Sequence, residues 1–288
     1  MIAIKKNNLT LKFNSFTFPG GEVGIKLNAG DYKFREEKAD HTTIIAHVQN
    51  SEDILQVAMV KDALQRIDNT PINLFIPYLP YARQDRVCDK GESFSLKVFC
   101  DLINNLEFEK VTICDPHSEV APALLDNVRV ISQFDIINKN LEFTKVGINC
   151  ILISPDSGSN KKTSEIAKYF THDSFVRADK LRDLTNGNIK ETIVYWNDFS
   201  KRDVVCVDDI CDGGKTFIEL AKVCKAKNCG KFILYVTHGI FSKGVKVLYQ
   251  NGIDEIWTTN SFRWINDQEN VKYDEKVNVL KLEEKFEI

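Results

Sequence analysis

The stretch VVCVDDICDGGKT, residues 204–216, predicts both a fold and a ligand site. An apolar strand at 203–207 ends in two acidic residues, and a Gly-Gly turn then leads into an amphipathic helix at 216–227. In open α/β sheets, ligands bind at the carboxyl ends of the strands. Glycines let backbone N–H groups approach a phosphate, and the N-terminus of a helix favours its negative charge. We therefore expect a phosphate site where this strand turns into its helix.

The acidic pair Asp208 and Asp209 suggests what else the ligand carries. Carboxylates do not bind phosphate directly, but they suit sugar hydroxyls or a metal ion. A phosphate on residues 212–216 beside vicinal hydroxyls describes a ribose 5-phosphate.

Two other interpretations of the same loop stay open. Residues 214–216 look like the end of a Walker A loop, although Asp209 stands where that loop requires its first glycine. The turn is also compatible with an ordinary helix start in which Asp212 is the N-cap.

Short apolar runs alternate with amphipathic stretches along the whole chain, which predicts an α/β fold with largely parallel sheets. The expected strands are 42–48, 72–77, 110–114, 150–154, 203–207, 231–236 and 255–258, and the expected helices are 52–66, 95–106, 159–170, 216–227 and 243–250. The polar, weakly patterned stretch 132–148 suggests a boundary between domains 1–139 and 140–288. The charged stretch 179–192, which contains Asn-Gly, is expected to be a mobile loop.

Composition limits the class of protein. The chain has 288 residues, of which 43% are apolar and 27% charged, with a net charge of −3. These values exclude a disordered chain and disfavour a wholesale nucleic-acid binder. We expect no membrane span and no signal peptide, because no long apolar stretch is found. The eight cysteines form no Cys-x-x-Cys pair, so we expect reduced thiols in a cytoplasmic protein.

Several segments resemble known families. Residues 208–216 resemble the phosphoribosyl-binding loop of type I phosphoribosyltransferases, and other segments narrow the resemblance to the ribose-phosphate pyrophosphokinases. These segments are FPGGE (18–22), PYLPYARQDR (77–86), DPHS (115–118), SPDSG (154–158), THG (237–239) and NGIDE (251–255). The chain departs from the family pattern at Gly20 and at 91–94. The resemblance implies two similar phosphoribosyltransferase-like domains, each a mainly parallel sheet flanked by helices, with ATP on 1–139 and ribose 5-phosphate on 140–288.

The resemblance also implies a reaction, transfer of the diphosphoryl group of ATP to the 1-hydroxyl of ribose 5-phosphate, with Mg²⁺ as cofactor. It implies ATP contacts from Phe18, Glu22, Arg83, Gln84 and His117. Ribose 5-phosphate contacts would come from Asp208, Asp209, Asp212, Gly213, Gly214, Lys215 and Thr216. The metal ligands would be His117 and Asp156, and the catalytic cations Lys180 and Arg182. The family's hairpin completes a neighbour's site, which implies a homodimer or a larger homo-oligomer.

Simpler interpretations of the same residues remain. Residues 83–86 could form a surface salt-bridge cluster, and His117 could be structural. Asp156 could cap a helix, the Lys180 stretch could be a solvated polar loop, and Phe18 could pack in a core. For the whole protein, the alternatives are a phosphoribosyltransferase or a catalytically silent subunit associated with a synthetase.

Overall fold

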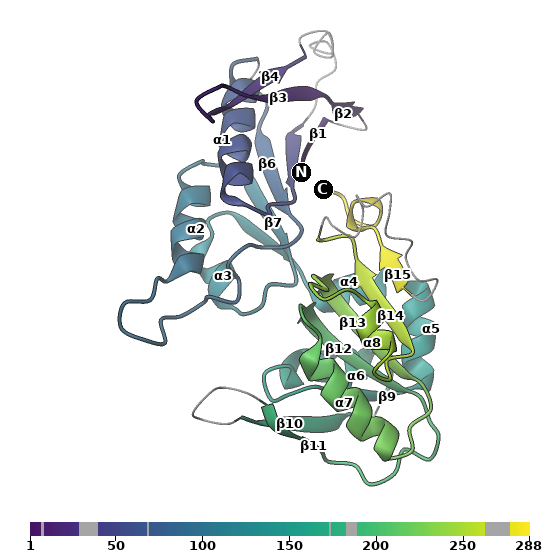
Figure 1. Cartoon of the computed structure of the whole chain (residues 1–288). Coiled ribbons are helices and arrows are strands. Elements are labelled where there is room, and N and C mark those ends of the chain that lie inside the picture. Colours follow the sequence, from purple (N-terminus) through teal and green to yellow (C-terminus); the bar gives the residue numbers. More distant parts are fainter. Residues whose placement is uncertain (7–8, 29–39, 68, 173, 183–188, 263–276) are drawn as a thin grey trace. The chain divides into compact units, whose positions relative to one another are not determined.

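The protein folds into two compact units, each with its own sheet (Figure 1). The computed structural model describes the chain except for residues 7–8, 29–39, 68, 173, 183–188 and 263–276. The first unit comprises residues 1–131 and 286–288, and the second comprises 132–285. Helices and mainly parallel strands alternate in both, which confirms the α/β class predicted from the sequence.

The first unit is built on a six-stranded sheet in the order β2-β1-β5-β6-β7-β8. The strands are β1 (Ile2–Lys6), β2 (Leu9–Leu11), β5 (Thr42–Ala46), β6 (Ile72–Ile76), β7 (Lys110–Cys114) and β8 (Val128–Ile131), and the helices are α1 (Ser51–Gln65), α2 (Ser95–Asn104) and α3 (Val120–Leu124). The strands β5 to β8 are parallel, whereas β1 pairs antiparallel with β5 and β2. Every residue of β5 and β6 is buried, as expected for strands covered on both faces.

A two-stranded hairpin adds to this unit without joining its sheet. Its strands are β3 (Phe13–Thr17) and β4 (Val23–Leu27), and β4 packs against α1. Ile25 and Leu27 face the hydrophobic core of the unit. The turn that joins the two strands is therefore presented to solvent.

The second unit is built on a seven-stranded sheet in the order β11-β10-β9-β12-β13-β14-β15. The strands are β9 (Ile151–Ser154), β10 (Val176–Arg182), β11 (Ile189–Val194), β12 (Val204–Cys211), β13 (Phe232–Gly239), β14 (Glu255–Thr259) and β15 (Val277–Leu280). All neighbours are parallel except β10 and β11. The helices are α4 (Gln133–Asn138), α5 (Leu141–Asn149), α6 (Asn160–Tyr169), α7 (Lys215–Ala226) and α8 (Lys246–Tyr249), with the 3₁₀ turn η2 (Leu282–Glu284) near the end.

Helices cover both faces of this second sheet. In Figure 1, α7 and α8 lie in front of the strands, and α4, α5 and α6 lie behind them. On the α7 side, Phe217 and Leu220 pack against Val204 of β12. On the other side, the buried ring of Phe143 lies 4.6 Å from that of Tyr235. Burial on both faces explains why the strands of this unit appear in the sequence as continuous apolar runs.

The direction in which the second sheet grows reverses between β9 and β12. From β9 the chain passes through α6 to β10 on one side, and from β12 it passes through α7 to β13 on the other. The loops that leave β9 and β12 therefore diverge from neighbouring strand ends, and the gap between such loops is where open α/β sheets bind ligands.

The structure differs from the sequence prediction in two stretches. The stretch 132–148, whose polar and weakly patterned sequence suggested a domain boundary, contains α4 and α5. The chain divides at 131/132, so α4 belongs to the second unit, whereas the sequence suggested a boundary after residue 139. A capping box between Ser132 and Asp135 begins α4, and six residues are too few to show helical periodicity.

The second difference concerns 179–192, predicted to be a loop. Its described residues belong to the antiparallel hairpin β10–β11, and its tip, 183–188, lies outside the described residues. This pair stands at the edge of the sheet and carries polar side chains, so the apolar run that marks the other strands is missing from its sequence.

Two chemical expectations can be compared with the described residues. No helix among them combines the length and apolar composition that a membrane span needs. All eight cysteines are free, and six of them are buried. Burial raises the pKa of the Cys206 and Cys114 thiols, so they behave as apolar core side chains.

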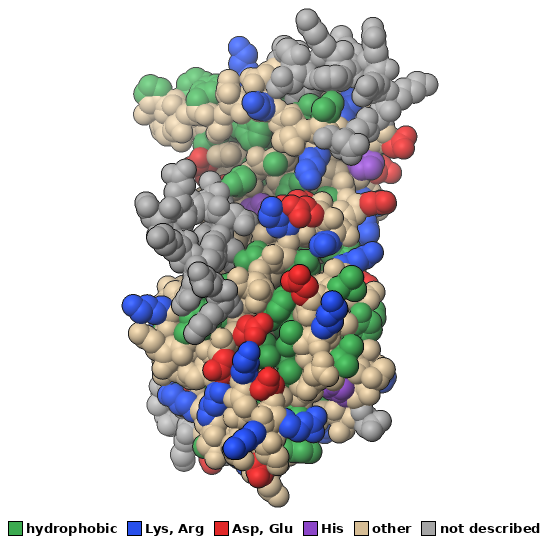
Figure 2. Space-filling view, turned by 90° about the vertical axis from the view of Figure 1, so that its right-hand side faces the viewer, with side chains coloured by type: hydrophobic (Ala, Val, Ile, Leu, Met, Phe, Trp, Pro, Cys, Tyr) green, Lys and Arg blue, Asp and Glu red, His purple; other side chains and the backbone are tan. Residues whose placement is uncertain are grey.

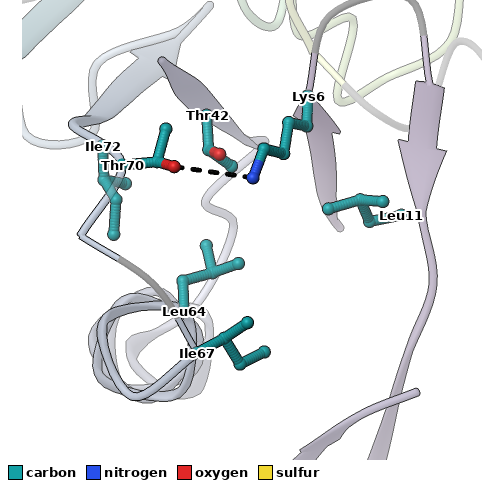
Figure 3. A pocket seen from close by; sticks show the side chains of 7 residues that line it. All are labelled: Lys6, Leu11, Thr42, Leu64, Ile67, Thr70 and Ile72. Atoms are coloured by element: carbon teal, nitrogen blue, oxygen red, sulfur yellow. Dashed lines mark hydrogen bonds between the residues drawn. The ribbon is translucent and has the colours of Figure 1, made fainter. Parts of the chain in front are cut away.

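One small cavity lies in the first unit at the end of α1 (Figure 3). Leu64 and Ile67 form its apolar side, and Lys6 donates a 3.5 Å hydrogen bond to the Thr70 hydroxyl across its polar side. None of its lining residues was predicted to bind a ligand.

Gly147 of α5 tests the packing behind the second sheet. A Cβ at this position would lie 2.2 Å from a ring carbon of Phe170, which is itself fully buried. We expect Gly147→Ala to lower the free energy of unfolding by about 1–3 kcal/mol in urea denaturation, although alanine is the better helix former. Ile148→Ala, on the exposed side of the same helix, is the control and should stay within about 0.5 kcal/mol of wild type.

Candidate active site

Acidic side chains from two loops meet where the second sheet reverses. Asp208 and Asp209 lie in the last half of β12, and Asp156 lies in the loop after β9. Ser159 connects them: its hydroxyl donates to Asp208 Oδ1 at 2.9 Å, and its backbone N–H donates to Asp156 Oδ1 at 3.2 Å. Asp208 Oδ1 also accepts the backbone N–H of Asp209 at 3.0 Å. The structure therefore brings together three acids that are separated by up to 53 residues in the sequence.

Two lysine side chains form ion pairs with these acids. Lys180 Nζ lies 2.7 Å from Asp156 Oδ2, and the lysine side chain is only 9% exposed. Lys162 Nζ lies 3.9 Å from Asp209 Oδ2. The Lys180 pair is short, and its lysine is mostly shielded from water, so the attraction between the two charges is screened less than in a surface ion pair.

The pKa values of the acids diverge. Burial, and then the charges of Asp209 and Asp156, raise the pKa of Asp208 to about 7. Burial also works to raise the pKa of Asp156, but the hydrogen bond and charge of Lys180, together with the bonds from Ser159, hold that pKa below its usual value. Neighbouring carboxyls with opposite shifts are typical of functional sites.

The donor set here fits a divalent cation. Mg²⁺ is held by oxygen ligands, usually one or two carboxylates completed by water and substrate phosphates. Burial, and then the negative charges of Asp209 and Asp156, raise the pKa of Asp208, and a cation bound there would offset these charges. Among the described residues, no three His, Cys, Asp or Glu side chains form a ready-made metal cluster.

The loop after β12 has the backbone that a phosphate site needs. Gly214 adopts φ +75° and stands at the N-cap of α7, with no side chain capping the helix. A Cβ on Gly214 would lie 2.3 Å from Leu248 Cδ2, so both the left-handed conformation and the close packing require glycine. The N–H groups of the first turn of α7 are left for a ligand. The interpretation of Asp212 as the N-cap is wrong, because Gly214 holds that position.

In the first unit, the segment after β6 presents two of the predicted ATP contacts to solvent. Tyr81 adopts φ 62°, and the backbone N–H of Gln84 donates to Tyr81 O at 2.8 Å, which closes a turn. Arg83 and Gln84 stand exposed on this turn. Their side chains are therefore accessible to a ligand.

The buried side chain of Asp85 holds this segment in place. Its side chain is 4% exposed, and it accepts hydrogen bonds from Arg86 Nε at 2.8 Å and Nη2 at 3.2 Å. The Arg86 bonds lower the pKa of Asp85 against the effect of burial, and a hydrogen bond from Ser118 and the charge of His117 lower it further. Asp85 therefore ties the loop after β6 to the loop after β7, which carries the exposed His117.

The hairpin places Phe18 and Glu22 at its turn. Phe18 is 52% exposed, so the interpretation of this ring as core packing is wrong. Its ring meets Phe16 edge to face at 5.1 Å, and its backbone N–H donates to Glu22 O at 2.8 Å. A side chain at Gly20 would collide with the Glu22 carboxylate, 2.6 Å away, so glycine there leaves room for Glu22.

The remaining predicted site residues of the second unit lie in α7, before α6 and at the end of β10. Lys215 and Thr216 form the first turn of α7, beside Gly213. The interpretation of Asp156 as a helix N-cap is wrong, because Ser159 holds the N-cap position of α6; Asp156 instead accepts the backbone N–H of Ser159 and pairs with Lys180. Arg182 ends β10, but its side chain lies outside the described residues.

Sequence analysis did not single out Ser159, Lys162, Gln133 or Asp85. Ser159 directly follows the SPDSG motif, and Lys162 lies one helical turn later. Their short spacing from Asp156 could therefore have indicated both residues as parts of the site. Gln133 donates to the backbone carbonyl of Asp208 at 2.7 Å from 75 residues away, and no local pattern points to it.

Comparisons with known proteins place the chain among related sequences and folds. Residues 5–106 match the family model for the N-terminal domain of ribose phosphate pyrophosphokinase. A ribose-phosphate pyrophosphokinase of Haemophilus influenzae is 30% identical over 271 residues, covering 92% of this chain and 82% of the relative. One from Mycoplasmopsis pulmonis is 29% identical over 273 residues, covering 93% and 81%. The fold matches the crystal structure of phosphoribosylpyrophosphate synthetase from Mycobacterium smegmatis with a TM-score of 0.75 at 18% identity, covering 94% of this chain and 86% of that one.

The fold and the strand-end acids beside a glycine loop define an α/β protein of the class that binds phosphorylated ligands at a sheet reversal. Within that class, the chain belongs to the ribose-phosphate pyrophosphokinase family.

Asp208 gives a pH prediction. Its pKa of about 7 exceeds the unfolded value of 3.8, so the folded state holds the proton more tightly, and the free energy of unfolding falls as pH rises from about 4 to 7. Asn at this position keeps the oxygen that Ser159 and Asp209 bond, without the charge. We expect Asp208→Asn to raise the melting temperature of the ligand-free protein at pH 8 by about 2–4 °C, with little change at pH 4.

Asp126→Asn, at an exposed position of the first unit, is the control for removing one negative charge. It should show the pH profile of wild type. Parallel profiles for wild type and Asp208→Asn would contradict the assignment of a raised pKa to Asp208.

For Asp85 we predict the opposite dependence of stability on pH. Its folded pKa lies below the unfolded value, so its contribution is present above about pH 4 and is lost as pH falls through the folded value. We expect Asp85→Asn to lower the free energy of unfolding by about 1–3 kcal/mol at pH 7 in urea denaturation, because it weakens a buried, charge-assisted bond to Arg86.

Asp89→Asn, exposed on the same segment, should be neutral within about 0.5 kcal/mol. Equal stability of Asp85→Asn and Asp89→Asn would show that Asp85 does not tie the two loops together.

Proposed function

We propose that this chain transfers the diphosphoryl group of ATP to ribose 5-phosphate, giving 5-phosphoribosyl 1-diphosphate and AMP. The observation that carries the proposal is the hydrogen-bonded set of Asp156, Ser159 and Asp208 in a member of this family. Asp208 lies in β12, and this strand leads directly into the Gly214 loop. Carboxylates beside an anion site suit the hydroxyls and the phosphate of one sugar phosphate.

In the second unit, residues 212–216 hold the 5-phosphate through their N–H groups and the Thr216 hydroxyl. Asp208 and Asp209 orient the sugar through its 2- and 3-hydroxyls. This leaves the 1-hydroxyl as the nucleophile. Its oxygen forms a bond to the β-phosphorus, the bond from that phosphorus to the oxygen bridging the α-phosphorus breaks, AMP leaves with the electron pair, and the hydroxyl proton is released to solvent.

In the first unit, Arg83 and Gln84 bind ATP, and the hairpin residues Phe18 and Glu22 hold adenine. Their exposure supports this role, because all four are accessible to a ligand. Asp85 positions the segment that carries Arg83 and Gln84. Arginine suits the triphosphate because its planar fork matches phosphate oxygens.

Mg²⁺ is the proposed cofactor; Asp156 of the second unit and His117 of the first are the residues proposed to ligate it, and the ion would offset the charge of the phosphates. Lys180 and Arg182 stabilise the charge of the transferred group. The hydrogen bond from Lys180 to Asp156 supports this role, since it places the ammonium beside a proposed metal ligand.

The proposal includes a cytoplasmic location and a homodimer or larger homo-oligomer. The exposed Phe16–Phe18 pair on the hairpin supports self-association, because clustered aromatic side chains are enriched at protein interfaces. Nucleic acid is not a proposed partner. On the face shown in Figure 2, basic and acidic side chains are intermixed, in keeping with the net charge of −3.

The direct test is AMP release from ATP that depends on ribose 5-phosphate and on Mg²⁺. The double variant Lys180→Ala/Arg182→Ala should lower kcat by about 10²-fold or more with a smaller effect on KM, because these cations act mainly on the transition state. Lys222→Ala, an exposed lysine of α7, is the control and should retain wild-type turnover.

The same assay separates the alternatives. A phosphoribosyltransferase would release no AMP and would instead consume the sugar diphosphate together with a base. A silent subunit would do neither. Wild-type turnover in the double variant would remove Lys180 and Arg182 from the mechanism.

A further inference from the structure

A second turn is tied directly to the phosphate loop. It connects β13 to α8, and the backbone N–H groups of Ile240 and Phe241 both donate to Cys211 O at 2.9 Å. Cys211 is the last residue of β12, immediately before the loop 212–216. Any side chain displayed by this turn is therefore held at a fixed distance from the loop.

The turn itself is well fixed. Phe241 is 3% exposed, and its ring fills the space where a Cβ on Gly239 would stand, 2.2 Å away. The backbone N–H of Gly244 donates to Phe241 O at 2.7 Å, and Gly244 adopts φ +74°. A buried anchor and a closed hydrogen-bonded turn leave residues 242 and 243 little backbone freedom.

Lys243 stands in this turn and lies along Gly213. The point where a Cβ on Gly213 would stand is 3.5 Å from Lys243 Cε, 3.7 Å from Cδ and 4.0 Å from Cγ. Three methylene groups thus pack over the glycine of the loop, and the ammonium is one bond beyond Cε. Lysines commonly bury their stems in this way while the charged group stays in water.

The Lys243 ammonium has no partner among the residues that the structure describes. The residue is exposed, and it forms no ion pair or side-chain hydrogen bond with the described part of the chain. Two other lysines near the site are engaged, Lys180 with Asp156 and Lys162 with Asp209. Lys243 is thus a cation held beside the loop and available to an anion.

We propose that Lys243 binds the 5-phosphate of the sugar held on residues 212–216, by capping the face of the loop formed by Gly213. This inference rests on the proposed function and adds a specificity residue to it. The backbone N–H groups recognise the shape of any tetrahedral anion, whereas a lysine adds a full charge that favours a dianionic phosphate monoester. Packing of the stem on Gly213 limits the freedom that the side chain loses on binding.

The test is calorimetric titration of the full-length protein with ribose 5-phosphate and, separately, with ribose. Lys243→Gln should weaken ribose 5-phosphate binding about ten-fold, because it removes one charge-assisted contact. It should leave ribose binding unchanged and reduce the loss of ribose 5-phosphate affinity between 50 and ~200 mM salt. Lys243→Arg should stay within about three-fold of wild type.

Lys246→Gln is the matched control, since Lys246 is an exposed lysine three residues along the chain. It should bind ribose 5-phosphate within about two-fold of wild type. Lys243→Gln binding as tightly as Lys246→Gln would overturn the role of Lys243 and leave the proposed function intact. A wild-type protein that binds no ribose 5-phosphate would instead overturn the proposed function, and this inference with it.

Discussion

Neighbouring parallel strands that lead to opposite sides of a sheet must send their loops apart, and the second unit places its chemistry in the resulting gap. The loop after β9 carries Asp156 and Ser159, and β12 ends in Asp208 and Asp209. The 2.9 Å hydrogen bond from Ser159 to Asp208 joins the two elements. The charge pair of Lys180 and the proposed contacts to a sugar phosphate both depend on this junction.

The junction has an electrostatic cost for the folded protein. Burial of Asp208, and then the charges of Asp209 and Asp156, raise its pKa to about 7, so the charged form of Asp208 is unfavourable there. Lys180 and Lys162 offset the charge of Asp156 and Asp209. Residues that destabilise the ligand-free state while serving a ligand are expected at functional sites, since selection acts on binding and turnover as well as stability.

In the first unit, a buried carboxylate positions a segment whose neighbouring side chains are exposed. Arg83 and Gln84, the proposed ATP contacts, are exposed. Asp85, one residue further on, points inward and receives bonds from Arg86 and Ser118. In the second unit, the turn that carries Lys243 is likewise held by a buried neighbour, Phe241. In both cases an exposed functional side chain is positioned by the burial of the residue next to it or two away.

The sequence by itself determined the α/β class, the strands that are buried on both faces, and the loop at 212–216, because apolar runs and glycine turns are local patterns. It did not reveal α4, which is too short to show a period, or the β10–β11 hairpin, whose strands lie at a sheet edge and carry polar residues. Only the tertiary structure decided that Gly214 and not Asp212 caps α7, that Phe18 is exposed, and that Lys243 lies on Gly213. These features depend on which strand lies beside which, and contacts between residues tens of positions apart leave no periodicity in the chain.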